Sequence, residues 1–190
     1  LKAMILLGVN CGFGNHDVGR LPRSAVDREA GWIDFPRPKT GIHRRCPLWP
    51  ETVEAIEAAI ASRPEPKEEF DADLVFVTSR GGSWAKKTSS NPVSSEFRKL
   101  IKSIDAKAAK EGTDRPDRSL MYRKGVGFYA LRHVFETIGG ESRDQAPVDH
   151  IMGHARDDMA SAYREWISDD RLRAVVDHVH DWLYAHPAGD

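Results

Sequence analysis

The sequence predicts a mainly α-helical domain that also contains a small antiparallel β-sheet. Apolar residues recur at helical spacing in several segments, and two short β-prone segments flank a Lys-Thr-Gly turn. The chain has 190 residues, of which 40% are hydrophobic. This is enough for one sizeable core and too little for two comfortable domains. We therefore expect a single domain over residues 1–190.

The first half of the chain is predicted to form short elements. Gly12 and Pro22 each end a predicted helix, and a further helix is predicted where Val53, Ile56 and Ile60 share one face. The predicted elements are the end of a helix at residues 5–11, a short helix at 17–21, strands at 32–35 and 44–48, a helix at 52–61 and a strand or extended segment at 74–77.

The second half is predicted to be helical apart from one loop. A basic amphipathic segment carries Phe97, Ile101 and Ile104 on its apolar face, whereas residues 111–124 lack periodicity and are expected to form the loop. The predicted helices cover residues 94–110, 128–138 (ended by Gly139-Gly140), 148–152, 159–166 and a last segment from Asp169 to about residue 184.

Charge is distributed unevenly along the chain, although the net charge is only −1. Residues 80–124 contain 12 Lys and Arg against 5 Asp and Glu, and residues 141–190 contain 5 against 11. Such asymmetry is compatible with one side that faces nucleic acid. The alternative is that these charges are solvated helix faces without a partner.

The cysteines and the N-terminal apolar run exclude several classes of protein. Cys11 and Cys46 have no metal-binding spacing and form no evident disulfide framework, which is typical of a reducing cytoplasm. The apolar residues 4–9 are too few to span a membrane, and no signal-peptide cleavage site follows them. We expect a cytoplasmic protein without a membrane partner.

Three polar residues in the second half suit phosphoryl transfer. Tyr129-Ala130-Leu131-Arg132-His133 is followed by Ile151-Met152-Gly153-His154 and then by Ala160-Ser161-Ala162-Tyr163. A guanidinium stabilises two phosphate oxygens at once, and a histidine adds a hydrogen bond to the same group. A tyrosine held in line with the leaving oxygen attacks the phosphorus. Taken singly, each residue is more often a surface charge, a helix end or a packing residue.

The order and spacing of these residues resemble the C-terminal half of the tyrosine recombinase (phage integrase) catalytic domain. That family reads roughly His-x-x-Arg-His, then Leu-Gly-His, then a nucleophilic tyrosine. The resemblance implies that Arg132 and His154 bind the scissile phosphate of DNA. It implies that Tyr163 forms a 3′-phosphotyrosyl link, with no metal or other cofactor. It also implies a bacterial or phage-derived source.

The predicted hairpin also resembles this family. Its Lys39-Thr40-Gly41 turn and the following Arg-x-Pro-Leu match the family's β-hairpin, whose lysine is the general acid on the leaving 5′ oxygen. The resemblance implies that role for Lys39. On its own, Lys39 would be interpreted as a solvated turn lysine.

Two positions depart from the family pattern. The family usually has Gly-Leu-Arg-x-x-Glu near the start of this domain, whereas Gly14 occupies the arginine position here and Asp17 the acidic one. Tyr129 stands where the His-x-x-Arg motif has its histidine. Tyr129 is kept as a candidate catalytic residue, although a tyrosine is a poor base near neutral pH.

The resemblance implies double-stranded DNA as the partner and an absent N-terminal core-binding domain, so that residues 1–190 form one catalytic domain fragment. We expect dimers or tetramers on DNA, assembled through the last helix. The predicted function is integrase-like recombination. The alternatives are a catalytically impaired DNA-binding relic and a helical interaction domain without a DNA role. The basic residues predicted to lie nearest the DNA backbone are Arg37, Arg44, Lys86, Lys87, Arg98 and Lys99.

Overall fold

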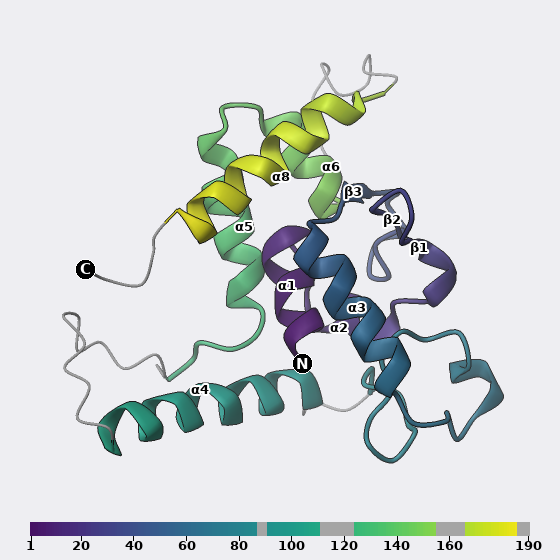
Figure 1. The fold of residues 1–190 in the computed structure, drawn as a ribbon. Coiled ribbons are helices and arrows are strands. Elements are labelled where there is room, and N and C mark those ends of the chain that lie inside the picture. The colour runs from purple at the N-terminus through teal and green to yellow at the C-terminus, as the bar shows by residue number, and fades with distance from the viewer. Residues whose placement is uncertain (87–90, 111–123, 155–165, 186–190) are drawn as a thin grey trace.

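The computed structural model describes residues 1–86, 91–110, 124–154 and 166–185 (Figure 1). The predicted fold class is confirmed, because helices dominate and one three-stranded antiparallel sheet is present. The helices are α1 (Lys2–Asn10), α2 (Asn15–Arg20), α3 (Pro50–Ser62), α4 (Pro92–Lys110), α5 (Ala130–Glu141), α6 (Gln145–Met152) and α8 (Asp169–Tyr184); the strands are β1 (Val26–Asp27), β2 (Trp32–Asp34) and β3 (Arg45–Pro47).

Helix α1 is the centre of the core, where it packs against α3, α5 and α8 (Figure 1). Its residues Met4, Leu7 and Val9 are buried. Gly8 allows the close crossing with α5, since a Cβ there would lie 2.9 Å from the Leu131 side chain. The helix ends before Gly12, whose φ of +61° is a conformation that side chains other than glycine rarely adopt. The predicted helix end at Gly12 is confirmed.

The sheet has the strand order β1-β2-β3. Ile33 of β2 pairs with Val26 of β1 and with Cys46 of β3. Buried Asn10 joins this sheet to α1, because its Nδ2 donates to Pro47 O at 3.0 Å and its Oδ1 accepts from Trp49 N at 2.9 Å. The hairpin between β2 and β3 is thereby fixed to the core, which matters because it carries the predicted general acid.

Helix α8 packs on α5, α6 and β3 of its own chain. Its residues Leu172, Val175, Val176 and Val179 are all buried, and Trp49 Nε1 donates to the Val176 carbonyl oxygen at 3.1 Å. The prediction that this apolar stripe is available to dock on a neighbouring protomer is therefore wrong for these four residues. They belong to the core in cis.

Two predicted element boundaries also need correction. Helix α5 continues through Gly139-Gly140 to Glu141 instead of ending there. Gly139 is packed against Val175 and Val148, and a Cβ on it would lie 3.4 and 3.5 Å from their side chains. Residues 74–77 form no extended strand pairing but only isolated bridges, from Leu74 to Pro22 and from Val77 to Ser83.

Helix α4 is anchored by its N-terminal end, where Val93 and Phe97 are buried, and it then extends away from the other helices (Figure 1). Most of the predicted loop at 111–124 and of the predicted helix at 159–166 lies outside the described residues. In the part of the chain that the structure covers, no helix is both long and apolar enough to cross a membrane.

Candidate active site

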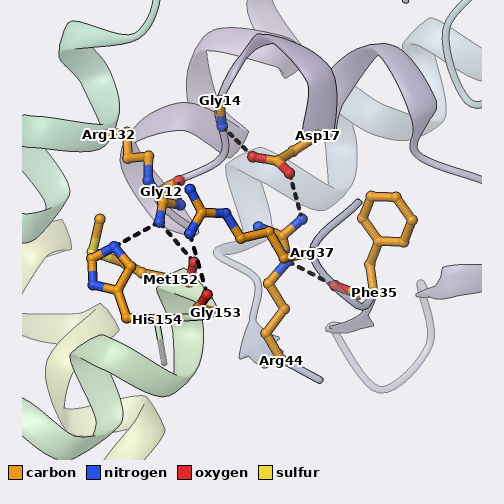
Figure 2. Close-up of polar contacts among 10 residues, drawn as sticks. All are labelled: Gly12, Gly14, Asp17, Phe35, Arg37, Arg44, Arg132, Met152, Gly153 and His154. Atoms are coloured by element: carbon orange, nitrogen blue, oxygen red, sulfur yellow. Dashed lines mark hydrogen bonds and ion pairs between the residues drawn. The ribbon is translucent and has the colours of Figure 1, made fainter. Parts of the chain in front are cut away.

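Arg132 and His154, the two predicted phosphate ligands, are in contact (Figure 2). Arg132 projects from α5 and is only 1% exposed. Its Nη1 donates to Gly12 O at 2.5 Å, and its Nη2 donates to Met152 O at 2.7 Å. The same Nη2 lies 2.9 Å from Nε2 of His154. Two segments that are distant in sequence, one at Gly12 and one at residues 152–154, thus converge on one guanidinium.

The end of α6 positions His154. Gly153 adopts φ +61° and ψ +45°, and this left-handed residue turns the chain so that the N–H of His154 donates to Asp149 O at 2.9 Å. Because Arg132 is a donor, Nε2 of His154 accepts in this contact. Nδ1 then carries the proton, and it lies 3.6 Å from Asp149 Oδ1. Burial, and then the charge of Arg132, lower the pKa of His154, so the ring is predominantly neutral at pH 7.

The β2–β3 hairpin brings Arg37 and Lys39 to the same region. Its tip is a turn in which Thr40 N donates to Arg37 O at 3.1 Å, with Pro38 at the position where proline favours such turns. Gly41 follows with φ +70°. Lys39 is exposed at this tip. The strand pairing therefore sets how far Arg37 and Lys39 reach toward α6.

Arg37 contacts the turn that carries His154. Its Nη1 donates to Gly153 O at 3.3 Å, next to the Met152 carbonyl that Arg132 uses (Figure 2). A Cβ on Gly153 would lie 3.0 Å from the Arg37 Cβ, so only glycine permits this approach without a shift. After burial, the charge of Arg37 is the next largest cause that lowers the pKa of Arg132. Two guanidinium groups therefore meet at the end of α6.

Arg44 has a structural role, and its prediction as a DNA-backbone contact is wrong. It is 2% exposed, and its Nη2 donates to Asp17 Oδ1 at 3.0 Å. Its Nε donates to Phe35 O at 2.7 Å, and its guanidinium carbon lies 4.1 Å from the centre of the Phe13 ring. Burial lowers the pKa of Arg44, whereas Asp17 opposes that effect. Asp17 Oδ2 also accepts from Gly14 N at 2.6 Å, so this pair fixes the backbone beside the site.

A cavity of about 580 Å³ lies next to this cluster. Tyr129 forms one wall, and its ring covers Gly14, where a Cβ would be 3.2 Å from Tyr129 Cε2. The two departures from the family pattern are therefore neighbours in space. Basic groups from α2 and the hairpin form much of the rest of the wall. The lining residues are Gly14, Asn15, His16, Asp17, Arg20, Arg37, Pro38, Lys39 and Tyr129.

The candidate residues occur along the chain in the order Lys39, Arg132 and His154. Their order, and their placement by α1, α5, α6 and the hairpin, can be compared with known proteins. A model of the phage integrase family matches residues 1–168. The chain belongs to the phage integrase family. A search of curated proteins found no significant match.

Solved structures of integrases and recombinases have the same fold. The integrase of the transposon Tn1549, in complex with a circular intermediate DNA, has a TM-score of 0.62 and 18% identity over 92% of this chain and 57% of that chain. XerA recombinase has a TM-score of 0.53 and 19% identity over 97% of this chain and 57% of that chain. XerH recombinase, in a post-cleavage complex with its palindromic difH substrate, has a TM-score of 0.54 and 18% identity over 90% of this chain and 43% of that chain. The chain thus has the fold of a tyrosine recombinase catalytic domain and spans about half of these proteins.

The structure does not bring the other described candidates, Lys86, Arg98 and Lys99, into this cluster. Tyr163 and Lys87 lie outside the described residues. Lys86, Arg98 and Lys99 are exposed, and Lys99 Nζ forms an ion pair with Glu96 at 2.6 Å. Their contact with DNA stays a prediction. Within the described ranges, no group of three or more His, Cys, Asp or Glu could hold a metal ion.

The sequence placed Arg37 only near the DNA backbone and missed its contact with the His154 turn. In the sequence, Arg20 is a basic residue six positions after Gly14 that would need a different backbone path to replace the missing arginine, and the structure places it in the lining of the cavity. The sequence feature that could have indicated these residues is Gly14. Because Gly14 leaves the family's arginine position without a guanidinium, one of the other basic residues is expected to take its place. Which of them reaches the site depends on tertiary contacts.

The packing of Tyr129 on Gly14 predicts a coupling between these positions. Gly14→Arg alone should lower the free energy of unfolding by about 1–3 kcal/mol, because its side chain must displace the Tyr129 ring. Adding Tyr129→His should recover at least about 1 kcal/mol of this loss, since the smaller ring leaves space. Urea unfolding of both single variants and the double variant measures the coupling. If the changes in unfolding free energy of the two single variants add up to that of the double variant, the Tyr129 ring and the new arginine side chain do not compete for the same space.

Proposed function

We propose that this protein is a site-specific DNA recombinase that cuts and rejoins double-stranded DNA through a 3′-phosphotyrosyl intermediate on Tyr163. The observation that carries the proposal is the 2.9 Å contact of Arg132 with His154 beside the hairpin of Lys39, in a chain of the phage integrase family. Arg132 comes from α5 and His154 from the turn after α6, and the family orders them in this way. A helical interaction domain without a DNA role offers no reason for this arrangement.

The proposed roles follow from the chemistry of each group. Arg132 stabilises charge that builds on the non-bridging phosphate oxygens, and His154 adds a hydrogen bond in the tautomer whose Nε2 carries the proton. The Tyr163 phenol releases its proton to solvent water as its oxygen–phosphorus bond forms, and the bond from phosphorus to the 5′ oxygen breaks. Lys39 gives a proton to that leaving oxygen. Attack of a 5′ hydroxyl on the phosphotyrosine reverses these steps and rejoins the strand, so the bond energy is conserved.

Double-stranded DNA is the proposed partner. The integrase of Tn1549 and XerH were solved in complexes with DNA, and both have this fold. Lys39, Lys86 and Arg98 are exposed and suited to phosphate contacts. Assembly as a dimer or tetramer on DNA remains part of the proposal, but through surfaces other than the buried stripe of α8. A separate core-binding domain preceding residues 1–190 is likewise a proposal.

The test is adduct formation with a nicked suicide substrate, in which the released strand diffuses away. We expect a protein–DNA adduct on a denaturing gel, and its complete loss in Tyr163→Phe. Tyr184→Phe is a control, since this tyrosine lies on α8 and packs near His180 and Trp49. An adduct that persists in Tyr163→Phe would assign the nucleophile elsewhere.

A second candidate function is DNA binding without efficient cleavage. It is favoured by Gly14, which supplies no guanidinium, and by the Tyr129 ring that covers it. Under this hypothesis the protein binds DNA in a salt-dependent manner, yet no variant and no substrate gives an adduct. The suicide-substrate assay therefore separates the two functions.

A further inference from the structure

We propose that Arg37 is a catalytic residue that supplies the second guanidinium on the scissile phosphate, which it binds in the cavity beside Tyr129. This inference rests on the proposed function, because it assigns the phosphate of that reaction to a place in the structure. It also predicts binding of a simple phosphate anion, which can be measured without cleavage.

Arg132 alone offers few donors to an incoming phosphate. It is 1% exposed, and it does not line the cavity. Contacts with Gly12 O, Met152 O and His154 occupy three of its five N–H groups. Arg132 therefore holds the backbone together around the site and leaves few donors for a ligand.

Arg37 joins the two parts of the site. It lines the cavity, and it also reaches the turn of His154 through its bond to Gly153 O at 3.3 Å. Within the described part of the chain, this single long hydrogen bond is the one that the Arg37 guanidinium makes, so up to four of its five N–H groups remain for a ligand. A planar guanidinium with spare donors suits a phosphate diester.

The charges around Arg37 favour an anion. Arg37, Arg44 and Arg132 are close enough that Arg37 and Arg44 each lower the pKa of Arg132. Asp17 is committed to Arg44 and to Gly14 N, and Asp149 faces His154. A phosphate between the guanidinium groups would relieve their mutual repulsion.

Two glycines make this placement possible. Gly153 lets the Arg37 stem approach the end of α6, where a Cβ would lie 3.0 Å from the Arg37 Cβ. Gly14 adds no side chain to the cavity, and the Tyr129 ring closes that side of it. The space next to Gly14 is thus reached by a guanidinium from the hairpin rather than from the start of α2.

The first experiment measures single-turnover cleavage of the suicide substrate at saturating DNA. We expect Arg37→Gln, which keeps much of the stem, to slow adduct formation by about 10²-fold or more, the usual loss for one preorganised donor. Arg37→Lys should recover only part of this loss, because it lacks the fork. Arg28→Gln, at an exposed position in the turn between β1 and β2, should leave the rate unchanged. Arg20→Gln tests the other arginine of the cavity.

The second experiment measures stabilisation by inorganic phosphate at constant ionic strength, which needs no cleavage. Phosphate should raise the melting temperature of the wild-type protein and of Arg28→Gln, and should have little effect on Arg37→Gln. Circular dichroism of each variant without phosphate establishes that it is folded. Equal stabilisation of wild type and Arg37→Gln would overturn the assignment.

The two experiments separate failure of this inference from failure of the proposed function. If wild type cleaves and Arg37→Gln cleaves equally fast, Arg37 is not the second guanidinium although the recombinase proposal stands. Loss of rate in Arg20→Gln instead would move the role to α2 and refute Arg37. If wild type forms no adduct, the recombinase proposal fails, and the phosphate titration alone supports or refutes the anion site at Arg37.

Discussion

Replacing Arg132 with alanine should reduce cleavage by about 10³-fold or more and also destabilise the domain. The loss of cleavage follows from its contact with His154, since both groups would act on the phosphate. The loss of stability follows from burial, because the carbonyl oxygens of Gly12 and Met152 would lose their donor. We expect the free energy of unfolding to fall by about 2–4 kcal/mol, a large part of the stability of an ordinary domain.

Suicide-substrate kinetics and urea unfolding measure these two effects separately. Arg132→Lys keeps a positive charge but loses the fork, so it should be more stable than Arg132→Ala while still cleaving poorly. His133→Ala is the matched control, because His133 is the next residue on α5 and its side chain is 67% exposed. It should change neither quantity appreciably. Wild-type cleavage by a folded Arg132→Ala protein would remove Arg132 from the active site.

The meeting of Arg132 with His154 could be predicted from the sequence. These two residues and their immediate neighbours resemble the family motif, and that motif implies the fold that brings them together. Helix α3 and helix α8 were predicted for a simpler reason: their apolar residues follow the helical period over three or more turns. In each case one continuous segment of the chain carries the signal.

The errors occur where burial depends on residues far apart in sequence. Arg44 was expected on the DNA surface because an arginine in a basic hairpin is usually exposed. Its actual environment needs Asp17 and the ring of Phe13, and the ion pair spans 27 residues. No local pattern shows that Phe13 will cover this guanidinium.

Arg37 and Gly139 show the same limit. The contact of Arg37 with Gly153 spans 116 residues, so its place beside the phosphate site follows from how the hairpin docks on α6. Gly139 was expected to end α5 on the basis of helix propensity. The packing of Val175 and Val148 against it outweighs that local preference. The sequence thus predicts which polar residues meet at the candidate site better than it predicts which cations are exposed enough to reach a ligand.

An aspartate at position 175 should unfold the isolated domain or leave it without fixed tertiary structure. Val175 is 0% exposed and lies on α8 against Gly139 of α5. An unpaired carboxylate there would cost at least about 3–5 kcal/mol, which approaches the stability of a typical domain. Near-UV circular dichroism and thermal unfolding of the Val175→Asp variant measure the effect.

Ala174→Asp is the matched control, because it introduces the same side chain one residue earlier, at an exposed position of the same helix. It should cost no more than the helix propensity of aspartate, about 0.5–0.7 kcal/mol. The comparison also decides between packing of α8 in cis and exchange of α8 between protomers. A Val175→Asp protein that stays folded as a monomer but fails to assemble on DNA would show that the stripe serves a neighbour. Loss of the fold in Val175→Asp alone places the helix in the core of its own chain, and assembly on DNA must then use a different surface.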